Sequence, residues 1–235
     1  MKKFLLLIVT ASLAITLAAC GADSADEENQ GEENVAEQAN AEVEVTEDEK
    51  VDDEEVVVNI NDAGVKGTQY NLIYAQTKMQ MHQFGQDIND LDSIKENTLE
   101  ELIAQELVKQ DAKEQGVEVS DEEVQTEFDN FKEENEEELQ SYLDEFELTE
   151  ETFKDQLFFS LVLDKYLDEQ IEVDEVSDEE AKEMYDNLKE QNEEIAEYDE
   201  LEDDIKSSLE NQQAQEKLQV KLEELKESAD IEKLI

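Results

Sequence analysis

Few residues of this chain could take part in catalysis or hold a metal ion. His82 is the only histidine and Cys20 the only cysteine, so no Ser-His-Asp set, activated cysteine or zinc cluster can be assembled. His82 lies within a helical pattern, where a packing or surface role is usual. The run Asp87-Ile88-Asn89 begins like a calcium loop, but Leu91 breaks its fifth position and the central glycine is missing. We therefore expect no catalytic residue, no metal site and no cofactor.

The N-terminal segment predicts export. Two lysines precede an apolar run over residues 4–17, and Leu17-Ala18-Ala19-Cys20 follows, which is typical of a signal peptide with small residues ahead of its cleavage point. The apolar run is short for a membrane span, and acidic residues follow at once. The ending resembles the bacterial lipobox, which implies cleavage before Cys20 and a diacylglycerol on its sulfur. Such a double acyl chain would anchor the protein stably to the outer face of the cell membrane.

The charge of the chain is extreme. Seventy acidic residues stand against eighteen basic ones, for a net charge of −52, which excludes nucleic acid as a partner. So dense a charge repels itself in dilute buffer and is screened at high ionic strength, where the Debye length is about 3 Å at 1 M salt. We infer a saline or alkaline exterior. An acidic surface suited to a basic client is the alternative.

Composition divides the chain after its signal peptide at residues 1–19. Residues 20–55 lack aromatics and are acidic at nearly every second position, so we expect a lipidated cysteine and a disordered acidic tether. We expect a helical core over residues 56–192, completed as the same domain by an amphipathic helix over residues 193–235. This length is enough for one modest core, or for a main lobe plus a packed terminal arm.

The ordered region reads as mainly helical, with one short strand and turn at its start. The β-branched run Val56–Ile60 predicts the strand, and Asn61–Gly64 predicts the turn. Apolar spacing of three and four residues predicts the helices. Their spans are about 68–84, 91–115, a third starting after 120, 139–146, 153–167, another starting after 177, and one long helix or two in tandem ending near 229.

Local signals define several helix ends. Gly116 is a natural residue to terminate a helix, and capping boxes begin at Ser120 and Ser177. The run Leu157–Leu163 is apolar nearly all round, so its helix should be surrounded by others and form the centre of the core.

Several of these segments, in this order, are similar to known landmarks. They are Val58–Asp62, Leu102–Leu107, Ala112–Val124, Leu148–Glu151, Leu161–Leu167, Val176–Tyr185 and the end from Tyr198 to Glu232. With these segments the chain resembles the foldase lipoproteins related to PrsA and the SurA N-terminal chaperone domain. Asp62 departs from the pattern, since a glycine is usual there.

The resemblance implies a chaperone module without an enzyme. In the related foldases a parvulin-type prolyl isomerase domain of roughly ninety residues follows the segment ending near Tyr185, whereas here only residues 188–196 separate the flanking segments. The resemblance therefore implies a membrane-anchored, extracytoplasmic holdase that binds unfolded secreted proteins without isomerase activity. The alternative is a structural lipoprotein that docks to a fixed membrane or cell-wall partner, and the long terminal helix also permits a homodimer.

Aromatic and methionine side chains are the candidates for client binding, since flexible methionines and flat rings suit promiscuous contacts. The same residues at helical spacing are also the usual pattern of a core. The candidates are Tyr70, Tyr74, Met81, Phe84, Phe128, Phe131, Tyr142 and Phe146.

Overall fold

A computed structural model describes residues 43–146, 148–192 and 195–235. The predicted signal peptide, Cys20 and most of the predicted tether lie outside these residues. The described chain forms two compact units. Unit 1 takes the residues up to Glu106 together with Asn135–Glu150 and Ala229–Ile235, and unit 2 takes Leu107–Glu134 and Glu151–Ser228.

The prediction of a mainly helical fold is confirmed. The helices are α2 (Gly67–Gln83), α3 (Leu91–Gln115), α4 (Asp121–Glu134), α5 (Glu136–Glu145), α6 (Glu150–Gln170), α7 (Asp178–Gln191) and α8 (Tyr198–Ser228). The strands are β1 (Val56–Ile60), β2 (Ala63–Lys66) and β3 (Ile231–Lys233). The structure thus has three strands where the sequence predicts one. The predicted C-terminal segment is divided, because α8 lies in unit 2 and β3 in unit 1.

A small antiparallel sheet in unit 1 has the order β2-β1-β3. A turn at Asn61 and Asp62 joins β1 to β2, and Asn61 adopts a positive φ of 54°, which asparagine tolerates better than most residues. On the other side, Ile60 of β1 pairs with Ile231 of β3. Strand β1 is central, so Val57, Val58 and Ile60 are fully buried. The sheet therefore joins the start and the end of the described chain.

Residues 43–55, which we call the strap, differ from the predicted disordered tether. The strap lies against α2, where the main chain of Val51 exchanges two 2.9 Å hydrogen bonds with the Asn71 side chain. Asp53 and Glu55 accept hydrogen bonds from the main-chain N–H groups of Thr68 and Gly67, which open α2. The N–H groups of a first helical turn need such partners. Order therefore begins before Val56, because the strap caps a helix that lies after it in sequence.

The predicted helix ends are largely confirmed. Ser120 and Glu123 exchange the hydrogen bonds of a capping box before α4, and Ser177 and Glu180 do so before α7. Gly116 has a φ of 84° and ends α3 as predicted. The C-terminal amphipathic pattern is one helix, α8, with no break into two.

The core of unit 2 surrounds α6. None of the residues 156–163 is exposed, as the all-round apolar pattern predicts. Phe153 of α6 packs against two rings of α4, with ring centroids 6.0 Å from Phe128 and 5.5 Å from Phe131. The fully buried Tyr166 donates a 2.5 Å hydrogen bond to Asp111 of α3, and Lys221 of α8 lies 3.5 Å from the same carboxylate. Burial, followed by this hydrogen bond, raises the pKa of Tyr166.

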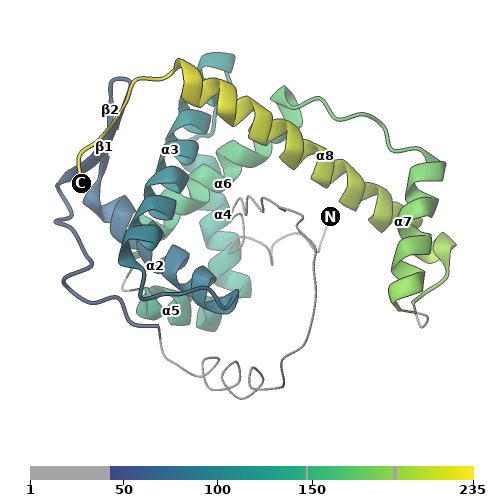
Figure 1. Cartoon of the computed structure of the whole chain (residues 1–235), viewed down its shortest axis with the longest axis horizontal. Coiled ribbons are helices and arrows are strands. Elements are labelled where there is room, and N and C mark those ends of the chain that lie inside the picture. Colours follow the sequence, from purple (N-terminus) through teal and green to yellow (C-terminus); the bar gives the residue numbers. More distant parts are fainter. Residues whose placement is uncertain (1–42, 147, 193–194) are drawn as a thin grey trace, which may run out of the picture. The chain divides into compact units, whose positions relative to one another are not determined.

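Helices α7 and α8 form a helical pair within unit 2 (Figure 1). Val176, Ala181, Tyr185 and Ile205 make its buried centre. Tyr185 also stacks edge-on against Tyr198, with ring centroids 5.4 Å apart. Six chain positions, 192–197, lie between the two helices.

Candidate functional site

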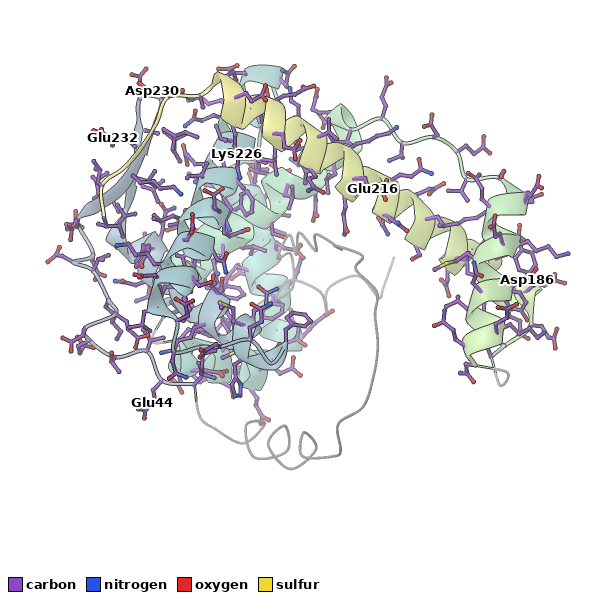
Figure 2. The ribbon with its side chains drawn as sticks, viewed as in Figure 1. Glu44, Asp186, Glu216, Lys226, Asp230 and Glu232 are labelled. Atoms are coloured by element: carbon purple, nitrogen blue, oxygen red, sulfur yellow. The ribbon has the colours of Figure 1, made fainter. Side chains whose placement is uncertain are left out.

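Helix α2 differs from the rest of the chain in charge. Residues 63–86 contain no aspartate or glutamate, although the composition of the chain would place about seven there. This is the longest acid-free run after Cys20. Other elements carry many acidic side chains, of which Figure 2 labels Glu44, Asp186 and Glu216. In a chain with a net charge of −52, α2 therefore offers an uncharged surface.

One side of α2 carries amides, a methionine and a phenylalanine. Gln76, Met79, Gln80 and Gln83 recur at helical spacing and are half-buried or exposed. Phe84 follows as the C-cap residue and is 68% exposed, the highest value among the large apolar side chains of the described residues. We call these five residues the α2 face.

The turn that ends α2 explains why Phe84 points outward. Gly85 has a φ of 66°, and its N–H donates to His82 O while that of Gln86 donates to Met81 O. This bonding pattern is that of a helix end with glycine in the left-handed conformation. The chain leaves the helix directly after Phe84, so no further turn covers the ring.

Two rings at the C-terminal end of α5 adjoin the α2 face within unit 1. The Gln76 side chain donates a 2.7 Å hydrogen bond to the Tyr142 hydroxyl. Tyr142 in turn packs against Phe146, with ring centroids 4.8 Å apart, and both rings are half-buried. We call the α2 face together with these two residues the α2–α5 surface.

Of the eight predicted client-binding residues, three belong to this surface: Phe84, Tyr142 and Phe146. Tyr70 and Tyr74 are each 2% exposed, Met81 7% and Phe128 2%, so these four are core residues and cannot line an open surface in this conformation. Phe131 is half-buried in unit 2 against Phe153. Gln76, Met79, Gln80 and Gln83 were not among the candidates, and the missing acidic residues are the signal that identifies them.

A buried ion pair fixes the strap to α2. Lys78 Nζ lies 2.6 Å from Glu49 Oε1, and their side chains are 8% and 5% exposed. Tyr74 and Thr46 also donate hydrogen bonds to the Glu49 carboxylate, at 3.0 and 2.8 Å, and Lys78 donates to Glu44 O at 2.7 Å. The network leaves no charge of the pair unpartnered.

The network shifts the titration of its members. Burial alone would raise the pKa of Glu49, but the hydrogen bonds from Lys78 and Thr46 outweigh it and lower the pKa to about 2. Burial, with the nearby Glu49 charge, raises the pKa of Tyr70 to about 12. At neutral pH Glu49 is therefore ionised and Tyr70 is neutral.

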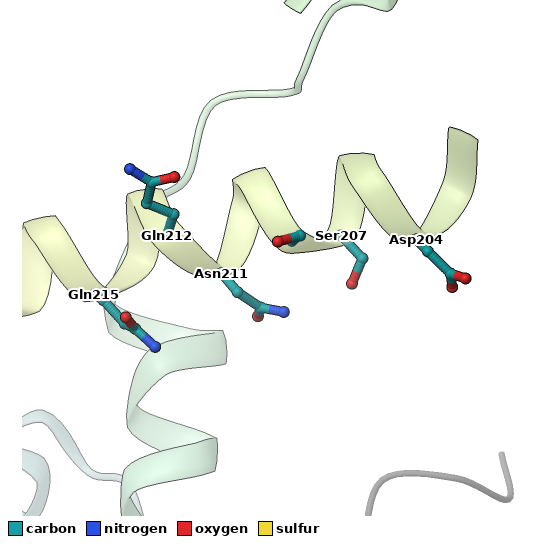
Figure 3. Close-up of a pocket in the computed structure, with 6 residues that line it drawn as sticks. Asp204, Ser207, Asn211, Gln212 and Gln215 are labelled. Carbon is teal, nitrogen blue, oxygen red and sulfur yellow. The ribbon is translucent and has the colours of Figure 1, made fainter. Parts of the chain in front are cut away.

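A shallow depression on α8 is a weaker candidate. Figure 3 shows its lining side chains projecting from successive turns of that one helix. They are Asp204, Ser207, Ser208, Asn211, Gln212 and Gln215. Because all six come from one helix, no second element can enclose a ligand, and we assign none.

Two features are absent from residues 43–146, 148–192 and 195–235. No group of three or more histidine, cysteine, aspartate or glutamate side chains is arranged to hold a metal ion there. Among the same residues, no helix combines the length and apolar character needed to cross a membrane.

Comparison with known proteins identifies relatives of the chain. A family model described as SurA-like N-terminal domain matches residues 1–167. The foldase protein PrsA of Caldanaerobacter subterraneus subsp. tengcongensis is 31% identical over 147 residues, which cover 58% of this chain and 44% of that protein. The chain thus spans less than half the length of this curated relative. These matches confirm the resemblance that the order of sequence motifs indicates.

Proposed function

Because this chain belongs to the SurA-like N-terminal domain family, we propose that it is an extracytoplasmic chaperone that holds unfolded segments of exported proteins at its α2–α5 surface. The observation that carries the proposal is the acid-free face of α2, which ends in the exposed ring of Phe84.

The chemistry of this surface suits a changing set of clients. Gln76, Gln80 and Gln83 carry amides that can donate to and accept from the main chain of any extended segment. Met79 adapts its shape to different apolar side chains, and the rings of Phe84 and Phe146 offer flat contacts. No contact of this kind requires a particular client sequence, which is what a holdase needs.

We assign no isomerase activity to the chain. The relative is named a foldase, but the aligned part covers under half of it, and only positions 192–197 separate α7 from α8. A parvulin domain of roughly ninety residues cannot fit between these helices. A proline-peptide isomerisation assay should therefore give the uncatalysed rate, and acceleration by the purified chain would contradict this assignment.

Anchoring through Cys20 is the second part of the proposal. Cleavage before Cys20 and attachment of two acyl chains would retain the protein at the membrane. A Cys20→Ser chain expressed in a Gram-positive host should move from the membrane fraction to the medium and should incorporate no labelled fatty acid. Continued membrane retention of this variant would show that another element anchors the chain.

The decisive test measures aggregation of a chemically unfolded secretory protein in the presence of the mature-length chain, residues 20–235 with Cys20→Ser to exclude lipid. Buffer with molar salt screens general charge effects. We expect suppression near stoichiometric ratios, and Phe84→Ser should weaken it several-fold without unfolding the chain, because the ring is 68% exposed.

Val220→Ser is the matched control, since Val220 is an apolar side chain of unit 2 that is 57% exposed. It should leave suppression unchanged. If a helical wild-type chain suppressed nothing, the chaperone proposal would fail, and a lipoprotein that docks to a fixed partner would become the better hypothesis.

A further inference from the structure

The carboxylates that border the α2–α5 surface indicate which clients it takes. We infer that it selects extended segments in which an apolar or aromatic residue is flanked by lysine or arginine. This inference rests on the proposed function and adds a charge preference to it. The argument depends on where the charges of unit 1 lie and on whether they are already neutralised.

Both sides of the uncharged surface are acidic. On the α2 side, the first acidic residue beyond Phe84 is Asp87, with Asp90 and Asp92 following before any lysine. On the α5 side, Asn135–Glu150 contains no basic residue. The exposed carboxylates of α5 are Glu136, Glu137, Glu138, Asp144 and Glu145.

The donors that reach these carboxylates are neutral groups. Asp87 accepts from the main chain and the amide of Asn89 at 2.9 and 3.0 Å, and these bonds keep the pKa of Asp87 below its ordinary value. Asp144 accepts from the amide of Gln140 at 2.8 Å. The lysine of α2, Lys78, is buried against Glu49. The border therefore keeps its negative charge.

One extended segment can reach both surface and border, because Asp87 follows Phe84 by three residues and Asp144 and Glu145 directly precede Phe146. An extended chain advances about 3.3 Å per residue, so a cation one to three positions from an apolar residue lies about 3–10 Å away from it. A ring or aliphatic side chain placed on Phe84 or Phe146 thus brings a nearby lysine or arginine to the carboxylates. Arginine can in addition stack on the rings of Tyr142 and Phe146. Segments with acidic flanks are repelled.

The test uses three fluorescent peptides of twelve residues that share one apolar, aromatic centre and carry lysine, serine or glutamate at both flanks. Binding to the mature-length chain is measured by fluorescence anisotropy at 0.05 M and 1 M NaCl. At low salt we expect the lysine peptide to bind about tenfold tighter than the serine peptide, and the glutamate peptide not to bind. At 1 M salt the difference should shrink to about twofold to threefold. Equal binding of the lysine and serine peptides at low salt would overturn the inference.

Two charge variants separate the border from the overall charge. Asp144→Asn with Glu145→Gln removes two border charges from the last turn of α5. Glu224→Gln with Glu227→Gln removes two exposed charges from the last turn of α8 in unit 2. Carboxylates oppose the dipole at a helix C-terminus, so neither pair of substitutions should unfold its helix.

The α5 substitutions should reduce the preference for lysine flanks at least threefold and leave the affinity for the serine peptide unchanged. The α8 substitutions should change neither the preference nor the affinity for the serine peptide. Equal effects of the two pairs would assign the preference to net charge and overturn the inference.

The Phe84→Ser variant distinguishes a failure of the charge preference alone from a failure of the proposed function. If it abolishes binding of the serine peptide while flank charge has no effect, the α2–α5 surface binds clients and only the charge preference is refuted. If no peptide binds a chain that circular dichroism shows to be helical, the proposed function fails and the inference fails with it.

Discussion

At the scale of single residues, the ion pair of Glu49 and Lys78 has to overcome the cost of its own burial. Removing two charges from water costs several kcal/mol per ion, and their attraction offsets this only if the remaining hydrogen-bonding capacity is satisfied. Here Thr46, Tyr74 and the Glu44 carbonyl complete the bonding of the pair. Removing one partner should therefore lower the free energy of unfolding by more than the intact pair contributes to it, because the other charge is left buried and unpaired.

The first prediction concerns Lys78→Met. Methionine fills a similar volume but leaves the Glu49 carboxylate buried without a counter-charge, so the free energy of unfolding should fall by about 3–5 kcal/mol. Urea unfolding followed by circular dichroism at pH 7 measures this. The double variant Glu49→Met with Lys78→Met buries no charge and should be more stable than the single variant. A single variant as stable as the wild type would contradict our account of the network.

The second prediction is a pH dependence attributable to Glu49. Its pKa is lowered from 4.5 to about 2 in the folded chain, so its stabilisation is complete above about pH 4.5 and is lost as the pH falls toward 2. The whole effect is about 3 kcal/mol. The gap in unfolding free energy between wild type and Glu49→Gln should therefore shrink by about 2 kcal/mol from pH 7 to pH 3. Both proteins share every other carboxylate, so parallel pH curves would refute the assignment.

The aromatic residues of α2 show how far the exposure of a single side chain can be predicted from the sequence. Tyr70, Tyr74 and Phe84 follow one helical pattern, yet two are buried and the third is 68% exposed. Spacing predicts that side chains share a face but does not identify which face meets solvent. The absence of acidic residues, and not the spacing, marks the face of α2 that we propose for client binding.

At the scale of elements, Gly67 marks the place where the strap crosses the start of α2. A Cβ atom at Gly67 would lie 2.0 Å from the carbonyl oxygen of Asp52 and 2.9 Å from a Val51 methyl carbon. A real Cβ cannot approach a main-chain atom so closely, so the strap and α2 can meet here only because this residue is glycine.

The third prediction follows from this contact. Gly67→Ala should force the strap off α2 or shift the helix, and overpacking of this kind costs about 3 kcal/mol. Gly85→Ala is the control, since nothing lies within 4 Å of its added Cβ and only its φ of 66° is unfavourable, at about 1 kcal/mol. Thermal unfolding should rank the two variants in this order, and the reverse order would refute the proposed role of Gly67.

Elements defined by local signals were predictable, and those defined by distant contacts were not. The capping residues Ser120 and Ser177 and the terminating Gly116 lie next to the helices they bound, so the sequence alone indicates α3, α4 and α7. Strand β3 exists because Ile231 pairs with Ile60, far away in sequence. The strap is likewise ordered by α2, and its acidic composition gives no sign of this.

At the scale of the whole molecule, the stability of the fold depends on contacts between distant segments and on the repulsion between their charges. Unit 1 is assembled from three stretches of sequence, and β3 is attached to β1 along one edge only. The net charge of −52 opposes every such closure, because bringing distant segments together also brings their carboxylates together. The folded state is therefore more repulsive than the expanded unfolded state.

The fourth prediction is that salt stabilises the fold by screening. The Debye length falls from about 10 Å at 0.1 M to about 3 Å at 1 M, so the free energy of unfolding should rise by at least about 2 kcal/mol between 0.05 and 1 M NaCl, mostly below 0.5 M. Sucrose strengthens burial without screening charge, and its effect should instead grow steadily with concentration. Urea unfolding of the mature-length chain distinguishes the two curves. If NaCl had no effect below 0.5 M, self-repulsion would not limit the stability of this protein, and its acidity would need another explanation, such as the attraction of basic clients.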